Sequence, residues 1–171
     1  SHGLGLAIVQ KIVELHGGQV LARNRRTGTG ASFEVVLPRA EAPTQCCRVL
    51  VAEDNPVNQT LVRRLLEKLG HHVEVVSDGR DAVQQARRQP FDLILMDVEM
   101  DGMNGVRATE LIRDHEPPHR RVPIVAMTAH TGESYTQRAL QAGMDDYAHK
   151  PVTRLKLLHL LERWAVANQA A

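Results

Sequence analysis

The feature that most constrains the fold of this chain is a regular alternation of short apolar segments with longer amphipathic segments beyond residue 47. The apolar segments are rich in Val, Ile and Leu, as is typical of strands that are buried on both faces. The amphipathic segments repeat their apolar residues at helical spacing and end near Gly or Pro. The expected strands are 48–52, 72–76, 93–96, 122–127 and 146–149, and the expected helices are 56–69, 79–88, 105–115, 133–141 and 155–166. Five strand–helix units predict an α/β fold, a parallel sheet with helices on both faces.

The first 38 residues have a different pattern. Apolar residues recur at helical spacing over 4–16, and two alternating segments at 19–23 and 31–37 flank a turn that contains Gly28 and Gly30. This pattern predicts a helix followed by a β-hairpin. A piece of about 40 residues with a two-stranded sheet is below the size that usually folds alone, so we interpret it as the end of a larger domain.

Composition excludes several functional classes. The chain has 171 residues, of which 43% are hydrophobic and 24% charged, with 21 Lys and Arg against 20 Asp and Glu. A net charge of +1 gives no basic field for nucleic acid or a membrane surface. The apolar runs are far shorter than the roughly 20 residues that cross a bilayer. We therefore expect a folded cytoplasmic chain without a nucleic-acid or membrane partner. The adjacent Cys46 and Cys47 are interpreted as small apolar residues rather than a metal or redox site.

Polar side chains stand where the expected strands end. Glu53 and Asp54 follow the first strand, Asp97 the third, Thr128 the fourth and Lys150 the fifth. Because the carboxyl ends of parallel strands meet at one edge of a sheet, these side chains are expected in one pocket.

Three carboxylates in one pocket repel one another unless a cation lies between them. An oxygen-only donor set without Cys or a strand-end His suits Mg²⁺, or Mn²⁺ as the alternative, rather than Zn²⁺. Taken singly, each residue also has a structural interpretation: a strand-end Asp can cap a helix, Lys150 can be a solvated turn residue, and Tyr147 can be half-buried packing.

Four segments, taken in order and with their spacing, closely resemble the receiver domain of two-component response regulators, in the version that is fused to hybrid histidine kinases. They are 53–58 (Glu-Asp-Asn-Pro-Val-Asn), 95–100 (Leu-Met-Asp-Val-Glu-Met), 126–130 (Ala-Met-Thr-Ala-His) and 143–151 (Gly-Met-Asp-Asp-Tyr-Ala-His-Lys-Pro). The resemblance implies a five-stranded flavodoxin-like sheet with strand order 2-1-3-4-5.

The resemblance also implies reversible phosphorylation of Asp97. It implies that Mg²⁺ is bound by Asp54, Asp97 and the backbone carbonyl of Glu99, with Glu53 acting through water. The chain departs from the family in the loop after Asp97, where such receivers usually have a proline and this chain has Asp101. Without the fixed φ of proline and with an added charge, we expect this loop to be more mobile and the Mg²⁺ affinity to be altered.

By the same resemblance, Thr128 and Lys150 would hold the phosphoryl group, and Tyr147 would turn inward as Thr128 moves. Two further residues, Glu99 and His130, lie two positions beyond Asp97 and Thr128. We hypothesise that these two side chains control how water reaches the phosphoaspartate.

The N-terminal segment resembles the last third of a histidine kinase ATPase domain. The resemblance lies in 3–9 (Gly-Leu-Gly-Leu-Ala-Ile-Val), 14–18 (Glu-Leu-His-Gly-Gly) and 28–33 (Gly-Thr-Gly-Ala-Ser-Phe). It implies that Gly3 and Gly5 contact the triphosphate of ATP at a helix N-terminus. The histidine box and the metal-binding and adenine-binding motifs of that family are absent from this chain, so we expect it neither to bind ATP usefully nor to act as a kinase.

Together these patterns predict an ATPase-domain remnant at 1–38, a linker at 39–47 and a receiver domain at 48–168. The expected function is phosphorelay: a histidine kinase phosphohistidine donates to Asp97, and a histidine phosphotransfer domain accepts. The parent kinase would carry any membrane anchor. One alternative is a receiver that acts as an interaction module without phosphorylation. A flavin protein is a second alternative, but it needs a hydroxyl-rich phosphate loop where Glu53 and Asp54 stand.

Overall fold

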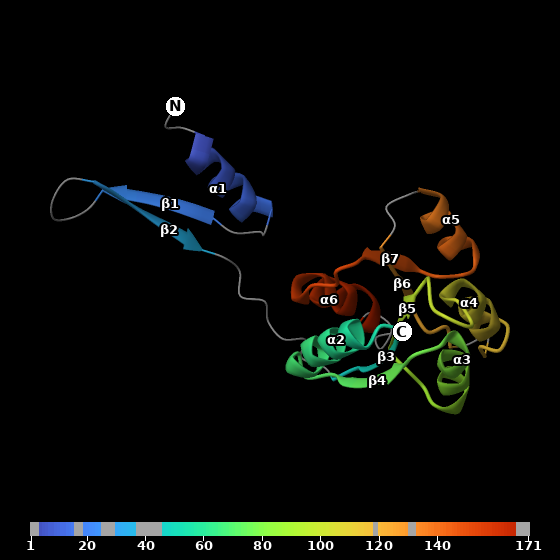
Figure 1. Cartoon of the computed structure of the whole chain (residues 1–171). Helices are drawn as coiled ribbons and strands as arrows, with labels where there is room; N and C mark the ends of the chain where they lie inside the picture. The colour runs from blue at the N-terminus through green and yellow to red at the C-terminus, as the bar shows by residue number, and fades with distance from the viewer. Residues whose placement is uncertain are drawn as a thin grey trace. The chain divides into compact units, whose positions relative to one another are not determined.

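The protein consists of two compact units, Ser1–Glu41 and Ala42–Ala171, called here the N-terminal unit and the C-terminal unit. The structure is a computed structural model, and it describes residues 4–15, 19–24, 30–36, 46–117, 120–129 and 133–166. Figure 1 labels the helices and strands of both units. Each unit is described by itself below.

The C-terminal unit is a five-stranded parallel sheet with the order β4-β3-β5-β6-β7. Its elements are β3 (Arg48–Ala52), α2 (Pro56–Lys68), β4 (His72–Val76), α3 (Gly79–Arg88), β5 (Leu93–Asp97), α4 (Gly105–Arg113), β6 (Ile124–Thr128), α5 (Glu133–Gln141), β7 (Asp146–His149), α6 (Arg154–Leu160) and the π-helical η1 (Leu161–Val166). Numbered from the first strand of this unit, the order is 2-1-3-4-5. The expected α/β fold and strand order are therefore confirmed.

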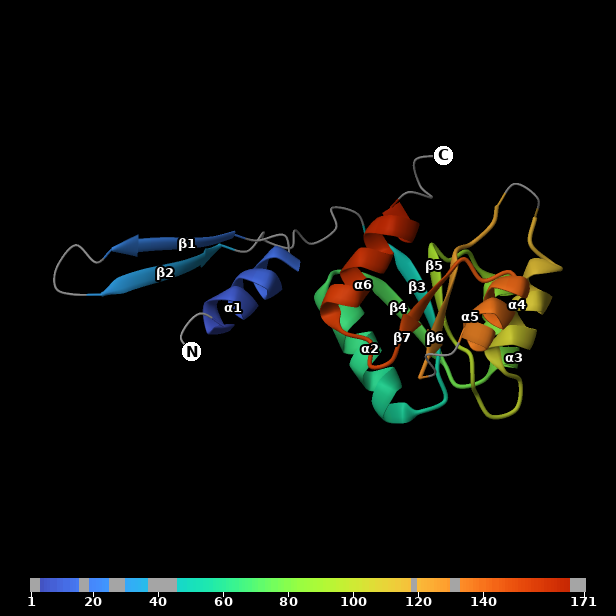
Figure 2. The same ribbon diagram turned by 90° about the horizontal axis from the view of Figure 1, so that it is seen from above.

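Helices cover both faces of this sheet. Figure 2 shows α2 and α6 on one side of the strands and α3, α4 and α5 on the other. Side chains alternate along each strand, so Val49 and Val51 enter the core under α2 and α6, whereas Leu50 and Ala52 enter the core under α3 and α4. Strands β3, β5 and β6 are buried at nearly every position because helices lie on both sides of them.

Several element ends differ from the expectations. Strand β5 includes Asp97, one residue beyond the expected end, and β6 begins at Ile124, directly after a proline that has no N–H to donate to the sheet. The last helix begins at Arg154, where the side chain of Thr153 accepts a hydrogen bond from the Lys156 N–H, and it continues as a π-helix. None of these shifts moves a candidate site residue out of its loop or strand end.

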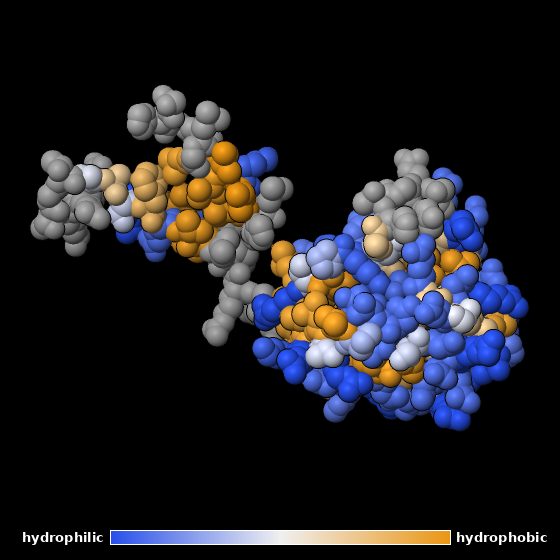
Figure 3. Space-filling view, in the orientation of Figure 1, coloured by the Kyte–Doolittle hydropathy of each residue, from blue (hydrophilic) through white to orange (hydrophobic). Residues whose placement is uncertain are grey.

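The N-terminal unit contains the expected helix and hairpin. Helix α1 (Leu4–Leu15) is followed by β1 (Gln19–Asn24) and β2 (Ala31–Val36), which pair antiparallel. All six residues of β2 are exposed. Figure 3 shows apolar side chains gathered on the surface of this unit. Gly5 lies in α1, whereas Gly3 and the expected linker residues up to Gln45 lie outside the described residues.

The cysteines differ in their surroundings. Cys47 is buried in the core of the C-terminal unit, where burial raises the pKa of its thiol to about 11, whereas Cys46 is exposed. Among the described residues, no helix has the length and apolarity that crossing a membrane requires.

Candidate functional site

The structure brings the five strand-end residues together. Parallel pairing aligns Ala52 with Met96 and Asp97 with Met127, so the residues that follow β3, β5 and β6 meet at one edge of the sheet. Carboxylate oxygens of Glu53, Asp54 and Asp97 lie within 4.8 Å of one another.

Asp97 is the centre of this cluster and is only 4% exposed. Its Oδ2 accepts a hydrogen bond from the Lys150 Nζ at 2.5 Å, and its Oδ1 accepts one from the backbone N–H of Glu99 at 3.2 Å. Lys150 lies in the loop after β7, and its own backbone N–H donates to the Thr128 carbonyl at 2.8 Å. The sheet and this loop therefore fix a carboxylate and an ammonium side by side.

Burial changes the proton affinities of this pair. The net pKa of Asp97 is raised to about 6, chiefly because burial disfavours its charged form; the Glu53 carboxylate also raises it, whereas hydrogen bonding and charge attraction from Lys150 act in the opposite direction. For Lys150, burial lowers the pKa, but its hydrogen bonds to Asp97 and Glu53 outweigh burial, and the net pKa is raised. The ammonium group therefore stays charged while Asp97 titrates close to neutrality.

Glu53 is held more firmly than its sequence position indicates. It is 1% exposed, and its Oε2 lies 2.7 Å from the Lys150 Nζ. Its Oε1 accepts a hydrogen bond from the Asn58 side chain at 2.9 Å. Asn55 caps α2 by accepting from the backbone N–H groups of Val57 and Asn58. The positioning role of Asn58 was not inferred from the sequence; the Glu-Asp-Asn-Pro-Val-Asn segment was the available signal.

Asp54 is positioned by the loop that departs from the family pattern. The backbone N–H of Asp101 donates to the Asp54 Oδ2 at 3.2 Å, a bond that a proline at this position could not make. The next residue, Gly102, has φ of 79°, the value that the third residue of a type II turn requires. A Cβ there would also lie 2.5 Å from the Asp78 Oδ2. The missing proline thus frees a donor for a candidate metal ligand.

The start of α4 is packed against the acceptor strand. The Gly105 N–H donates to the Val98 carbonyl at 3.1 Å, and a Cβ on Gly105 would come within 2.1 Å of the Asp97 carbonyl oxygen. Only glycine permits this close approach.

The expected switch residues occupy different surroundings. Thr128 is buried at the end of β6, whereas Tyr147 is 43% exposed and packs its ring against His149 at a centroid distance of 5.4 Å, edge to face. The Glu99 residue is exposed beside Asp97. His130, paired with Glu99 in our hypothesis on water access, lies outside the described residues.

The donor chemistry fits a hard divalent cation. Three carboxylates converge here, two of them buried and one half-buried, and the cluster includes no sulfur or imidazole ligand. Mg²⁺ prefers such oxygen donors, so the residues present suit the ion that the sequence predicts.

A doubly wound sheet with an acidic cluster, a hydroxyl and a lysine at its carboxyl edge defines the class of the receiver proteins. Residues 49–162 match the model of the response regulator receiver domain, and residues 1–41 match that of the histidine kinase-, DNA gyrase B- and HSP90-like ATPase. The chain belongs to the response regulator receiver domain family, and its C-terminal unit is a receiver domain of two-component signalling. The resemblance stated from the sequence is confirmed.

Curated relatives are sensor kinases. The chain is 42% identical over 130 residues to the signal transduction histidine-protein kinase BarA of Escherichia coli (strain K12), covering 75% of this chain and 14% of that protein. It is 41% identical over 143 residues to the sensor protein GacS of Pseudomonas syringae pv. syringae, covering 78% of this chain and 16% of that protein. The chain therefore spans about one seventh of the length of these relatives.

Solved structures show the same fold. The receiver domain of sensor histidine kinase PA1611 from Pseudomonas aeruginosa PAO1, with a magnesium ion coordinated in the active-site cleft, matches with a TM-score of 0.66 and 44% identity, covering 71% of this chain and 99% of that one. A second similar structure is the complex of the Saccharomyces cerevisiae histidine phosphotransfer protein Ypd1 with the receiver domain of Ssk1. It matches with a TM-score of 0.68 and 29% identity, covering 74% of this chain and 92% of that one.

Proposed function

We propose that the C-terminal unit accepts a phosphoryl group on Asp97 and passes it on in a phosphorelay. The observation that carries this proposal is the buried Asp97 carboxylate, which pairs with the Lys150 ammonium and lies within 4.8 Å of two further carboxylates at the carboxyl edge of the sheet. The magnesium ion in the cleft of the similar receiver of PA1611 supports the use of the acidic cluster as a metal site.

The chemical step needs no residue from outside the site except the donor. An oxygen of the Asp97 carboxylate forms a bond to phosphorus as the P–N bond of a phosphohistidine breaks. The imidazole nitrogen of the donor keeps the electron pair and takes up a proton from water. Asp54, Asp97 and the Glu99 carbonyl would hold Mg²⁺, with Glu53 acting through water. When bound, the ion neutralises charge on the phosphoryl oxygens.

The remaining residues hold the product. Lys150 already lies 2.5 Å from Asp97, so its ammonium can follow the new phosphoryl oxygens with a small movement. Thr128 ends the neighbouring strand and supplies a hydroxyl to the same group. Tyr147, which is exposed here, turns inward when Thr128 moves toward the phosphoryl group.

A docking surface for a histidine phosphotransfer domain lies beside the site. Exposed apolar side chains of α2 and α6, Val57, Leu61 and Leu155, are 73%, 44% and 44% exposed. Leu61 also lines a small hollow together with Lys150 and Pro151, so this apolar surface reaches the phosphorylation site. The complex of Ypd1 with the Ssk1 receiver supports a partner of this kind.

For the whole chain, we assign residues 1–38 to the end of an ATPase domain, 39–47 to a linker and 48–168 to the receiver. In this assignment, Gly3 and Gly5 contact the ATP phosphates within the ATPase domain of the parent protein. The parent protein is then a hybrid histidine kinase whose phosphohistidine serves as donor, and the receiver works in the cytoplasm.

The decisive experiment is incubation with Mg²⁺ and acetyl phosphate, followed by intact-mass measurement. We expect the mass of one phosphoryl group to be added, and Asp97→Asn to abolish the addition. No adduct, or an adduct that survives in Asp97→Asn, would rule out phosphotransfer and favour a phosphorylation-independent interaction module.

The docking surface has a separate test. Leu61→Asp should slow transfer to a histidine phosphotransfer domain at least tenfold while phosphorylation by acetyl phosphate is unchanged. Leu140→Asp on α5, a residue that is 46% exposed on the opposite face of the sheet, is the matched control. Equal transfer rates in the two variants would exclude this docking surface.

A further inference from the structure

A hollow in the C-terminal unit lies at the edge of the sheet opposite to Asp97. Its volume is about 420 Å³, within the range of small-molecule sites. It is lined by the ends of α3 and α4 and by the segments that lead into β5 and β6. Those are the amino ends of the strands, whereas Asp97 and Thr128 stand at the carboxyl ends. This hollow is therefore separate from the phosphorylation site.

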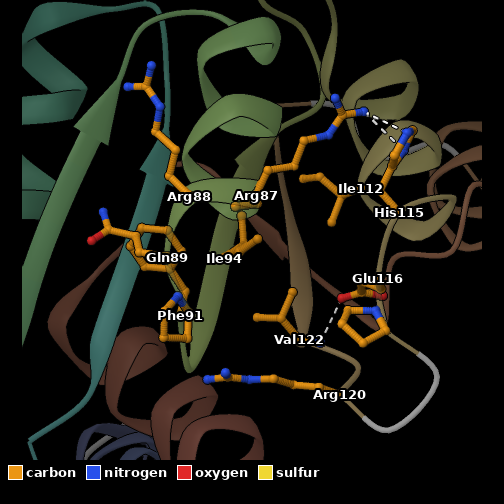
Figure 4. Close-up of a pocket in the computed structure, with 13 residues that line it drawn as sticks. Arg87, Arg88, Gln89, Phe91, Ile94, Ile112, His115, Glu116, Arg120 and Val122 are labelled. Atoms are coloured by element: carbon orange, nitrogen blue, oxygen red, sulfur yellow. Dashed lines mark hydrogen bonds between the residues drawn. The ribbon is translucent and has the colours of Figure 1, made fainter.

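The floor of the hollow is apolar. Ile94 and Ile112 are buried and Val122 is half-buried, and all three line it. Figure 4 shows these three side chains between Arg87 on one side and Arg120 on the other. Phe91 adds an aromatic ring to the wall. Such a surface favours a flat apolar group.

The rim of the hollow carries an excess of positive charge. Arg87, Arg88 and Arg120 line it, and within the described part of the chain no carboxylate pairs with their guanidinium groups. Arg87 donates instead to the ring of His115 at 3.0 Å. The carboxyl ends of α3 and α4 contribute only about −0.5 charge each. The three guanidinium groups exceed that charge.

The carboxylate in the lining is already neutralised. Both oxygens of Glu116 accept from the Arg113 guanidinium at 2.7 Å, and one also accepts from the Val122 N–H at 2.8 Å. Glu116 therefore holds the wall together and does not compensate the rim arginines. An incoming anion would meet guanidinium donors without displacing an internal ion pair.

We propose that this hollow binds a small organic anion that has a flat apolar body. The body lies on Ile94, Ile112 and Val122, and the acidic group is held by the guanidinium group on one side of this floor, that of Arg87 or that of Arg120. Arg88 points away from the hollow in Figure 4, so it adds to the field without direct contact.

The test uses 2-naphthoate as the probe and 2-naphthamide as its uncharged match. Amide ¹H–¹⁵N spectra of the whole chain are recorded without Mg²⁺ or phosphodonor, so the result is independent of phosphotransfer. We expect 2-naphthoate to cause saturable shifts of the backbone amide signals of Ile94, Ile112 and Val122. We expect 2-naphthamide, which lacks the charge, to bind at least tenfold more weakly.

Variants locate the anion. Of Arg87→Gln and Arg120→Gln, the one that removes the contacting guanidinium should weaken 2-naphthoate about tenfold, the loss of one charge-assisted contact. Arg64→Gln on α2, exposed on the other face of the sheet, is the control and should bind as the unaltered chain does. Equal affinity for the two probes, unchanged affinity in both arginine variants, or shifts confined to the N-terminal unit would each overturn the proposal.

Discussion

The two units of this chain have similar apolar residues in their strands, but most of these residues are buried in the C-terminal unit and exposed in the N-terminal unit. In the C-terminal unit, β5 and β6 are buried at every position, because helices cover both faces of the sheet. In the N-terminal unit, every residue of β2 is exposed, including Phe33 and Val35. An apolar pattern therefore specifies an element, but a second layer must be present before that element contributes a core.

The difference separates sequence pattern from stability. Helix α1 leaves Ile8, Val9 and Ile12 exposed by 56%, 42% and 51%, and Val13 is buried. Exposed apolar area contributes little to the free energy of unfolding, whereas each buried Ile or Leu contributes about 1.5–3 kcal/mol. The stability of the chain should accordingly reside in the C-terminal unit.

Preparing the two units separately gives the strongest test of the difference in stability between them. Residues 46–171 alone should unfold cooperatively in urea with the same midpoint as the main transition of the whole chain. Residues 1–41 alone should show no cooperative transition, because about 40 residues that leave every residue of β2 exposed cannot offset their chain entropy. Circular dichroism during denaturation measures both. A cooperative transition in residues 1–41 would contradict the contrast between the units.

A matched pair of substitutions tests the same contrast at single residues. Ile124→Ala on β6 removes a side chain that is 0% exposed and should lower the free energy of unfolding by about 2–5 kcal/mol. Ile12→Ala on α1 removes one that is 51% exposed and should change it by less than about 0.5 kcal/mol. Urea denaturation of both variants gives the two values. Losses of equal size would show that α1 is covered in solution.

The sequence predicts the parts of this fold and site that depend on local pattern. Strand–helix alternation gave the parallel sheet, and the positions of Glu53, Asp97 and Thr128 at strand ends placed them at one edge. Lys150 was placed there by the same rule. These predictions succeed because chain direction alone decides where a parallel strand ends.

The unpredicted features depend on contacts between segments far apart in the chain. The tie between Asp101 and Asp54 joins residues 47 positions apart through a backbone donor that no side-chain pattern records. Likewise, the hollow beneath α3 and α4 requires the relative placement of two helices and two strand entries. Such features depend on tertiary packing rather than on periodicity.

Within the C-terminal unit, the buried charge of Asp97 should lower the free energy of unfolding, whereas the apolar core raises it. The folded-state pKa of Asp97, about 6, lies above its ordinary 3.8, so the folded state binds the proton more tightly. The contribution of Asp97 to the free energy of unfolding is therefore fully present below about pH 4. It is lost as the pH rises through 6, and the loss is about 3 kcal/mol at most. Without Mg²⁺, Asp97→Asn should be more stable than the unaltered chain at pH 7, and the gap should close by pH 4.

Urea denaturation of both proteins between pH 4 and 7 measures this gap, since all other titrating groups are common to the two. Mg²⁺ added at pH 7 should stabilise the unaltered chain more than Asp97→Asn, because the ion offsets the buried charge. A gap that does not change with pH would show that the charged form of Asp97 is not disfavoured by burial.

The smallest expected effect concerns the loop that joins the core to the site. Asp101→Pro restores the residue usual in the family and fixes φ, but it removes the N–H that holds the Asp54 Oδ2. Asp101→Ala keeps this N–H and removes only the charge. If the hydrogen bond positions Asp54 for Mg²⁺, Asp101→Pro should bind the ion about fivefold more weakly than Asp101→Ala, the equivalent of one hydrogen bond of about 1 kcal/mol. Isothermal titration calorimetry with Mg²⁺ separates the effect of the lost hydrogen bond from that of a more rigid turn. If Asp101→Pro binds Mg²⁺ as tightly as Asp101→Ala, or more tightly, the rigidity of the turn outweighs the lost donor.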